Sequence, residues 1–361
     1  MPLYLKSIGF SALLIGVLEG FAEATAGLSK GYFGNMSDRT GKRKPFVQIG
    51  YGLSAISKPM IAIFIFPVWI FFARALDRLG KGIRTSARDT ILSDESTTET
   101  KGRIFGLHRG LDTAGAFIGP LLALLFLSLY AEKYSTLFLI AFIPGALAIL
   151  LSALIKENKH TGTASINSKS FLGFLKYWNI SSAEYKRLIV GLLFFSLINS
   201  SDIFLLLRMK DIGFGSSNII IIYIFYNFIY AITSFPMGIA ADKIGLKNIF
   251  VIGLLLFSFV YGGMALQPSL VVIFGLFFVY ALYASATESI SKAWITNVCK
   301  KEDTATAIGF FTSLSSIFTL IASTLAGLLW VGVSPSAPFA VTAFGGIILI
   351  LYFTLIFRGK K

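Results

Sequence analysis

The chain alternates long apolar stretches with short polar gaps, and this pattern limits what it can fold into. Eleven stretches approach the length of about 20 helical residues that crosses a hydrocarbon core of about 30 Å. They cover residues 9–33, 45–65, 67–92, 104–129, 134–155, 187–208, 217–240, 247–267, 269–296, 304–331 and 336–358. Because lipid offers no partners for backbone polar groups, such stretches must be helical. The sequence therefore predicts an all-α integral membrane protein with eleven transmembrane helices.

Composition agrees with a chain that mostly faces lipid or other helices. Hydrophobic residues make up 55% of the 361 residues and charged residues 14%, and the mean hydropathy is +0.76. A soluble globular protein carries about 25% charged residues.

The net charge of +14 could indicate a nucleic-acid partner, but the bases are unevenly spread. They gather in alternate gaps, at 39–44, 101–103, 156–186, 243–247 and 300–301, and in the tail 358–361. Cytoplasmic loops of membrane proteins carry such an excess of Lys and Arg. We therefore interpret the charge as a topology signal, expect no nucleic acid, and place the C-terminus in the cytoplasm of a multi-pass inner-membrane protein.

Two copies of one short motif lie 204 residues apart, each in a gap between two apolar stretches. The first reads GNMSDRTGKR and the second GIAADKIGLK. In each, an Asp with a base beside it follows a Gly by four residues, and another Gly comes three residues later. The positions concerned are Gly34, Asp38, Arg39, Gly41 and Arg43 in the first copy and Gly238, Asp242 and Gly245 in the second. Such a repeat predicts two structurally related halves.

The paired loops resemble the signature loop of the major facilitator superfamily, which joins the second helix to the third and, more weakly, the eighth to the ninth. Three further segments look like one bacterial branch of uncharacterised transporters: EGFAE at 19–23, DRLGKGIR at 77–84 and GLHR at 106–109. The resemblance covers nearly the whole chain and implies a fold of two pseudo-symmetric helical bundles.

The resemblance also implies that the first loop braces the two halves and acts in gating. Asp38 would meet Arg84 or Arg88 and the backbone near Thr304. Solvated loop charges are the alternative. The brace of the second loop is less well supported, because Leu246 stands where a base is usual.

The longest polar break, 156–186, is expected to be a cytoplasmic linker. It separates an N-terminal bundle of five helices (1–155) from a C-terminal bundle of six (187–361). Subtracting the repeat distance from helix 187–208 projects a partner at about −17 to 4, before Met1. The superfamily normally keeps both chain ends in the cytoplasm, so we expect the first of twelve helices to be missing, through a misplaced start or a truncation. A natural eleven-helix variant is the alternative.

Charged residues inside the expected spans are candidates for a substrate or proton path, because each costs about 2.5–3.5 kcal/mol at a helix centre. Glu19 and Glu23 lie one turn apart on one helix face. A second set follows helical spacing and forms one polar stripe: Asp77, Lys81, Arg84 and Arg88. The path candidates are Glu19, Glu23, Lys58, Asp77, Lys81, Arg109, Asp112, Glu288 and Lys292.

Three interpretations of these charges stay open. They could line a water-filled path that binds a charged substrate and relays protons. They could form ion pairs between packed helices, such as Glu23 with Lys58 or Asp112 with Arg109. Some could lie at the cytoplasmic interface, namely Arg84, Arg88, Asp89 and His108.

The second half carries fewer charges inside its spans: Asp202, Glu288 and Lys292. The repeat distance relates Arg84 to Glu288 and Arg88 to Lys292. Charges at equivalent positions of two repeats fit a central site at the repeat interface. An ion pair between Arg84 and Glu288 would close one gate.

Signals for an enzyme or a cofactor are missing. No Gly-rich loop followed by Lys-Ser/Thr would bind ATP, His108 and His160 are too far apart for an obvious metal site, and no Ser-His-Asp arrangement is credible. The expected activity is secondary transport of a small organic solute by alternating access. Proton coupling through Glu19, Glu23 or Asp77 is expected, and export is slightly favoured.

The substrate class stays open. A base-rich path favours an anionic or zwitterionic metabolite, whereas many aromatic residues favour export of an amphipathic compound. The expected partners are the solute, protons and the lipid bilayer, and a monomer is expected. The alternative is a non-transporting membrane protein: a sensor, a scaffold or an inactive truncated transporter.

Overall fold

The computed structural model describes most of the chain. The described residues are 5, 9, 12–64, 66–130, 133–157, 164–166, 168, 170–266 and 268–357. Within them, the side chains at 12–17, 19, 20, 22, 24 and 216 are outside the description.

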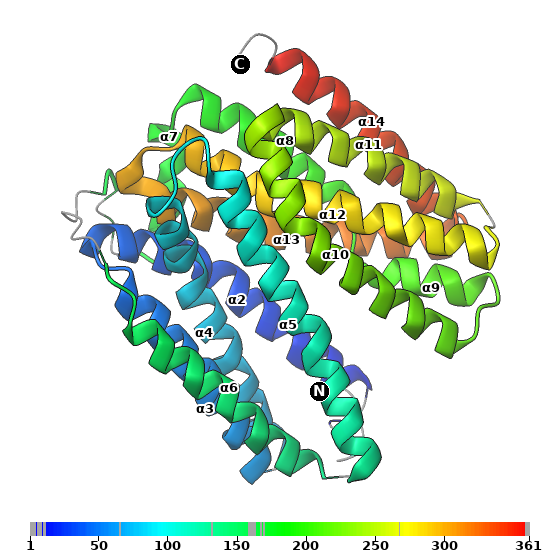
Figure 1. The fold of residues 1–361 in the computed structure, drawn as a ribbon, viewed down its shortest axis with the longest axis horizontal. Coiled ribbons are helices and arrows are strands. Elements are labelled where there is room, and N and C mark those ends of the chain that lie inside the picture. Colours follow the sequence, from blue (N-terminus) through cyan, green and yellow to red (C-terminus); the bar gives the residue numbers. More distant parts are fainter. Residues whose placement is uncertain are drawn as a thin grey trace. The chain divides into compact units, whose positions relative to one another are not determined.

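The described residues fold into helices joined by short connections (Figure 1). The helices are α2 (Ala12–Thr40), α3 (Lys44–Ile63), α4 (Pro67–Asp94), α5 (Lys101–Leu129), α6 (Tyr134–Ala153), η1 (Gly173–Lys176), α7 (Tyr177–Ile180), α8 (Ala183–Ile198), α9 (Ile203–Asp211), α10 (Ser216–Ile244), α11 (Leu246–Ala265), α12 (Leu270–Val298), η2 (Lys301–Asp303), α13 (Thr304–Gly332) and α14 (Ala337–Ile356).

Nine stretches of these described helices are long and apolar enough to cross a membrane. They are Lys44–Ile63, Lys101–Leu129, Tyr134–Ala153, Ala183–Asp211, Ser217–Ile244, Leu246–Ala265, Leu270–Val298, Lys301–Gly332 and Ala337–Ile356. The predicted all-α membrane fold is thus confirmed. The predicted count of eleven spans is not established, because α4 carries a stripe of charges and α2 is described only in part.

The stretch 187–208, expected as one helix, is two helices with a break at 199–202 between α8 and α9. The break reads NSSD, and such side chains offer the backbone hydrogen bonds that compete with a helix. The amide of Ser201 donates to Ser323 Oγ at 3.1 Å instead of continuing the helical ladder. Polar side chains therefore interrupt an otherwise apolar span.

The chain forms two compact units, which do not follow the order of the sequence. Unit 1 comprises Met1–Asp94, Leu121–Ser181 and Cys299–Ser316, and unit 2 comprises Glu95–Pro120, Ser182–Val298 and Ile317–Lys361. Each unit therefore includes segments from both halves of the sequence, and α5 and α13 are each divided between the units. The division into bundles 1–155 and 187–361 stays a prediction.

In unit 1, α4 packs against both α2 and α3, and α3 also packs against α6 (Figure 1). Small residues allow α3 and α4 to approach closely. A methyl group added at Gly50 would lie 2.6 Å from the carbonyl oxygen of Gly80. Phe46 and Val47 of α3 then pack against Ile83 of α4. Close backbone approach through small residues is typical of packing between membrane helices.

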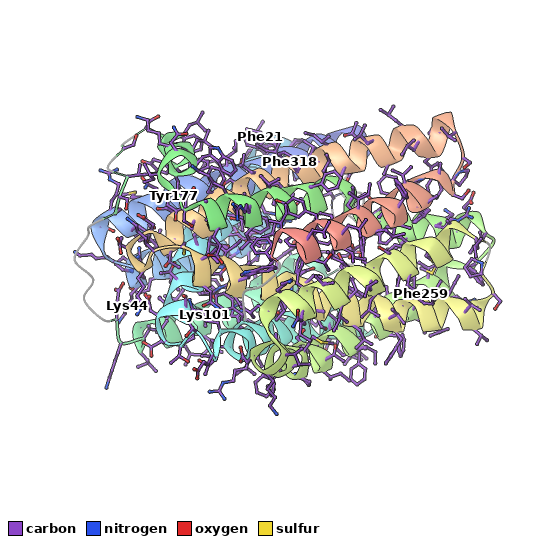
Figure 2. All side chains as sticks on the ribbon, turned by 90° about the horizontal axis from the view of Figure 1, so that it is seen from above. Phe21, Lys44, Lys101, Tyr177, Phe259 and Phe318 are labelled. Atoms are coloured by element: carbon purple, nitrogen blue, oxygen red, sulfur yellow. The ribbon has the colours of Figure 1, made fainter. Side chains whose placement is uncertain are left out.

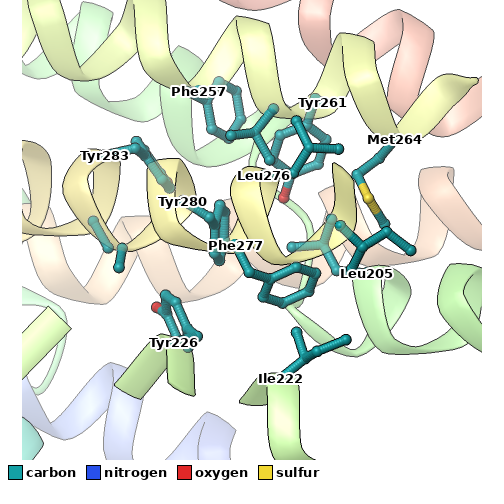
Figure 3. Close-up of a cluster of buried hydrophobic side chains, with 14 of the residues drawn as sticks. Leu205, Ile222, Tyr226, Phe257, Tyr261, Met264, Leu276, Phe277, Tyr280 and Tyr283 are labelled. Atoms are coloured by element: carbon teal, nitrogen blue, oxygen red, sulfur yellow. The ribbon is translucent and has the colours of Figure 1, made fainter. Parts of the chain in front are cut away.

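In unit 2, α12 packs against α10 and α11, and α11 packs against α14. The buried core between them is rich in aromatic side chains (Figure 3). Tyr226, Tyr261, Tyr280 and Tyr283 are each at most 5% exposed. Because a buried tyrosine hydroxyl needs a hydrogen-bond partner, this core can hold polar groups that a purely aliphatic core could not.

The outer faces of the helices carry exposed apolar side chains. Phe259 of α11 is 64% exposed and Val271 of α12 is 82% exposed (Figure 2). Large exposed apolar faces are unfavourable in water and suit contact with lipid.

Candidate functional site

The first motif contains a buried carboxylate, that of Asp38 near the end of α2. Asp38 is 2% exposed and pairs with Arg43 at 2.5 Å. It also accepts hydrogen bonds from the amide of Ala305 at 3.3 Å and from the amide and hydroxyl of Thr306, both at 2.6 Å. These amides lie in the first turn of α13, where free backbone N–H groups favour a negative charge. Asp38 thus ties the end of α2 to the start of α13 inside unit 1.

Burial and charge oppose each other at this carboxylate. Asp38 lies beyond the apolar part of α2, and burial raises the pKa of its carboxyl to about 6. The Arg43 guanidinium and the hydrogen bonds from Thr306 and Ala305 lower that pKa, but less than burial raises it. The carboxyl therefore titrates close to physiological pH.

The partners of Asp38 differ in part from those expected. The backbone that it contacts lies next to Thr304, as the resemblance implies. Its base is Arg43 of the same loop, not Arg84 or Arg88. Arg84 donates to Ser54 Oγ at 2.8 Å, and Arg88 pairs with its neighbour Asp89 at 3.0 Å.

The first loop is also tied to the linker. Arg39 donates to the carbonyl oxygen of Ser168 at 2.9 Å, and Asn35 donates to that of Ile166 at 3.3 Å. Asp303, the last residue of η2 before α13, accepts from the amide and hydroxyl of Ser165 at 2.9 and 2.7 Å. The described part of the linker is therefore held against the same helix ends as the first loop.

The second motif loop makes the matching contact in unit 2. Asp242 at the end of α10 accepts hydrogen bonds from the amides of Gly102 at 2.7 Å and Arg103 at 2.9 Å. These two amides lie in the first turn of α5. Asp242 therefore caps α5 as Asp38 caps α13, with each half of the sequence capping a helix of the other half.

The structure gives a steric reason for glycine at each of these motif positions. A side chain at Gly34 would strike the carbonyl oxygen of Ala305, and one at Gly238 would strike that of Gly102. Gly41 and Gly245 have φ values of 64° and 103°, a conformation that residues with a side chain rarely adopt.

The predicted charges on α4 form ion pairs inside unit 1. Asp77 pairs with Lys58 at 3.0 Å and with Arg74 at 3.2 Å, and Arg78 pairs with Glu23 at 2.8 Å. The pair of Glu23 with Lys58, offered above as one alternative, is not formed: Lys58 pairs with Asp77, and Glu23 pairs with Arg78. Glu23 lies on α2, and its side chain is 58% exposed.

Two other predicted residues of unit 1 are less informative. Lys81 is an exposed residue of α4 one turn beyond Asp77. The side chain of Glu19 lies outside the described residues.

In unit 2 the predicted residues of α5 and α12 meet. Arg109 forms ion pairs with Glu288 and, at 3.5 Å, with Asp112. Its Nε also donates to the hydroxyl of Tyr230 on α10 at 2.6 Å. The side chains of Glu288 and Asp112 are 47% and 53% exposed. The pair of Asp112 with Arg109 is one of the ion pairs that the sequence offered. Glu288, for which an ion pair with Arg84 was predicted, pairs instead with Arg109 of α5.

Lys292 lies one turn beyond Glu288 on α12 and is half-buried. It therefore extends the polar face that Glu288 begins.

The break between α8 and α9 brings a further carboxylate to this region. Tyr280 donates to Asp202 at 2.8 Å. Sequence reasoning noted Asp202 but gave it no role, and it missed Tyr230 and Tyr280. Tyrosines in an apolar helix look like core residues, and only their hydroxyl contacts reveal that they serve charged groups.

In the described part of the chain, no group of three or more His, Cys, Asp and Glu side chains could hold a metal ion. The arrangement consists instead of carboxylates, guanidiniums and tyrosine hydroxyls within apolar helices. Such groups can bind charged solutes and exchange protons.

The sequence matches the profile described as Major Facilitator Superfamily over residues 1–225 and 188–361. It is 34% identical over 361 residues to an uncharacterised MFS-type transporter of Methanocaldococcus jannaschii, a match that covers 97% of this chain and 87% of that protein. A second match is 33% identical over 150 residues to an uncharacterised protein of Mycobacterium tuberculosis and covers 41% of this chain and 36% of that protein.

Two solved structures are similar in fold. The human organic anion transporter MFSD10 (TETRAN) matches with a TM-score of 0.79 and 16% identity, over 98% of this chain and 88% of that chain. The E. coli fucose:proton symporter FucP matches with a TM-score of 0.74 and 12% identity, over 99% of this chain and 95% of that chain.

Proposed function

Because the chain belongs to the major facilitator superfamily, we propose that it is a secondary active transporter that moves a small organic solute by alternating access. The transport is coupled to protons, with export favoured. No enzymatic step is part of this proposal.

The observation that carries the proposal is the ion-paired cluster around Arg109 in unit 2. It joins α5 to α12 through Glu288 and to α10 through Tyr230, and all three helices are apolar enough to span a membrane. Charges at such positions are costly unless they serve a path or a switch. Since Glu288 remains about half exposed, its carboxylate is accessible to a proton or a solute.

The motif loops supply the conformational part of the mechanism. Asp38 and Asp242 each cap the N-terminus of a long helix from the other half of the sequence. Breaking and remaking such caps requires relative movement of the halves, so each contact favours one of two states. We propose that these loops are gating braces.

The charges of unit 1 favour an anionic or zwitterionic solute. The predicted path is rich in bases, with Lys58, Lys81 and Arg84. The similar structures include an organic anion transporter and a fucose:proton symporter. Their likeness concerns the fold, so the solute class rests on the charges alone.

The proposed setting follows the distribution of bases along the sequence. Lys and Arg gather in alternate gaps and in the C-terminal tail, which places these gaps and the C-terminus on one side of the membrane. Because cytoplasmic loops carry such an excess of bases, we propose an inner-membrane protein with a cytoplasmic C-terminus. We also propose that it is a monomer. The second candidate, a non-transporting membrane protein, has no specific contact in its favour.

The test is transport by the purified protein in liposomes with an imposed pH gradient. Radiolabelled organic anions and zwitterions serve as probes, and a pH-sensitive dye inside the liposomes reports proton movement. The proposal predicts gradient-dependent accumulation of a probe with matching proton flux, both lost in Glu288→Gln. A folded protein that moves neither probes nor protons would contradict the proposal and favour the non-transporting alternative.

A further inference from the structure

The break between α8 and α9 places an acidic residue inside an apolar span. Ala183–Asp211 is long and apolar enough to cross the membrane, yet residues 199–202 are not helical. Asp202 is the last residue of this break. A charge inside a span is a candidate functional group because lipid and packed helices do not solvate it.

Asp202 has a hydrogen-bond donor but no base in contact with it. The donor is the hydroxyl of Tyr280, at 2.8 Å, and among the described side chains no Lys or Arg forms an ion pair with Asp202. Although Asp202 precedes α9, its side chain accepts no capping hydrogen bond from that helix. The carboxyl is therefore turned toward α12 and not toward its own helix end.

Tyrosines from three other helices surround this contact. The ring centroid of Tyr280 lies 5.1 Å from that of Tyr226 of α10, 5.2 Å from that of Tyr283 and 6.3 Å from that of Tyr261 of α11. All four rings are at most 5% exposed (Figure 3). Little water can reach the Tyr280 side of the carboxyl.

Charged side chains of two neighbouring helices act on Asp202 with opposite signs. Glu288 on α12 repels an ionised Asp202, and Arg109 on α5 attracts it. Arg109 is already paired with Glu288 and Asp112. The N-terminus of α9 also favours the ionised form, by an effect that falls off within the first turn of a helix.

The break also holds a hydrogen-bond acceptor for which the described residues offer no hydrogen-bond donor. Asn199 Oδ1 is buried and has no hydrogen-bond partner in the described part of the chain. A protonated carboxyl is a donor, whereas an ionised carboxylate is not.

A metal cation fits the break less well. The carbonyl oxygens of Ser201 and Asp202 accept hydrogen bonds from Phe204 and Leu205, and that of Ile198 accepts one from Thr342. These three carbonyl oxygens are therefore already engaged, and a hard cation takes about six oxygen ligands.

We propose that Asp202 is the carboxyl that binds and releases the coupled proton in unit 2. This rests on the proposed proton-coupled transport. The site takes up a proton at the α8–α9 break, keeps it through a neutral hydrogen-bonded pair with Tyr280, and releases it when the carboxyl meets water or Arg109.

The experiment is a pH titration of the full-length protein in lipid nanodiscs, followed by infrared difference spectroscopy of protonated carboxyl groups. Well above pH 7, where Asp38 with its pKa of about 6 is ionised, wild type should show a protonated carboxyl band that Asp202→Asn removes. The matched control, Asp112→Asn, should keep the band because Asp112 is half exposed and ion-paired.

Contrary results are equally clear. A band that survives in Asp202→Asn would overturn the proposal, and so would a band that sodium chloride removes at constant pH, since the break would then hold sodium. In liposomes, Asp202→Asn should lose gradient-driven accumulation of the labelled probe but keep exchange without a gradient. If Asp202→Asn keeps gradient-driven accumulation, this inference fails while the proposed function stands. If wild type accumulates no probe, the proposed function itself fails.

Discussion

The two motif loops share a framework and differ in their electrostatics. In both, a glycine lies against the backbone of another helix and an aspartate caps that helix, Asp38 on α13 and Asp242 on α5. Only Asp38 adds an ion pair, with Arg43, and an extra hydroxyl, from Thr306. Asp38 is buried, whereas Asp242 remains partly exposed.

Local helix geometry explains the missing ion pair. In the first loop α2 ends at Thr40 and α3 begins at Lys44, so Arg43 is outside both helices and can fold back onto Asp38. In the second loop Gly245 alone separates α10 from α11. The motif aligns Arg43 with Lys247, which is already helical and donates to the carbonyl oxygen of Phe357 at 2.8 Å.

A third contact is common to both loops and was not apparent from the motif. Lys44 donates to the carbonyl oxygen of Ala153 at the end of α6, and Lys247 donates to that of Phe357 at the end of α14. Cations are favourable at helix C-termini. The comparison teaches that caps and close approach are the constant part of the brace, and that the buried ion pair is a variable addition.

The largest expected difference concerns loss of the aspartates. Asp38→Ala should lower the free energy of unfolding by about 3–5 kcal/mol, because it leaves Arg43 buried without its partner. Asp242→Ala should cost about 0.5–2 kcal/mol, the usual cost of losing an N-cap. Reversible denaturation in bicelles would measure both, and equal losses would show that the ion pair adds nothing.

The glycine contacts should give a smaller effect, and one that is alike in both loops. Gly34→Val and Gly238→Val each place a side chain against a carbonyl oxygen and should cost about 1–3 kcal/mol. Gly52 of α3, which has open space around it, is the matched control: Gly52→Val should cost less than either. The same denaturation assay applies, and a tolerated Gly34→Val would refute the close approach of α2 and α13.

The two loops should also differ in how their contribution to stability depends on pH. Since the pKa of Asp38 is raised to about 6 in the folded protein, the folded state binds this proton more tightly than the unfolded state. Stability from Asp38 therefore falls as pH rises through this range, by about 1 kcal/mol between pH 5 and pH 7. Wild type should show this difference relative to Asp38→Asn, and no comparable difference should separate wild type from Asp242→Asn.

The smallest expected effect is a gain in the second loop. Leu246→Arg supplies a base four residues after Asp242 and should stabilise the protein by about 0.2–1 kcal/mol, as partly exposed ion pairs do. The gain should vanish in the Asp242→Asn background. A gain of equal size in both backgrounds would mean that the new side chain acts without Asp242.

Much of the fold could be predicted from the sequence, because apolar length and motif repeats are local signals. The stretches that became α10 and α12 follow from apolar length, and the placement of Asp38 next to the start of α13 follows from the family resemblance of the motif. The break at 199–202 was missed because four polar residues in an apolar span do not reveal whether a helix bends around them or stops.

The partners of the charged residues could not be predicted in the same way. Arg43 rather than Arg84 pairs with Asp38 because the turn between α2 and α3 is long enough for Arg43 to fold back onto Asp38. The motif does not fix the length of this turn. Arg109 reaches both Glu288 and Tyr230 because three helices meet there. Such contacts depend on helix rotation and packing, whereas a sequence gives only positions along each helix.

The central claim is that the motif loops brace a protein that exchanges between two states. It is tested most directly by a spin-label distance between the loops, with Lys42→Cys in unit 1 and Lys243→Cys in unit 2 on a Cys299→Ser background. Both positions are exposed. The account predicts two distance populations in lipid nanodiscs, whose ratio shifts when Asp38→Asn removes the charge of the first brace. A single distance that Asp38→Asn leaves unchanged would contradict it.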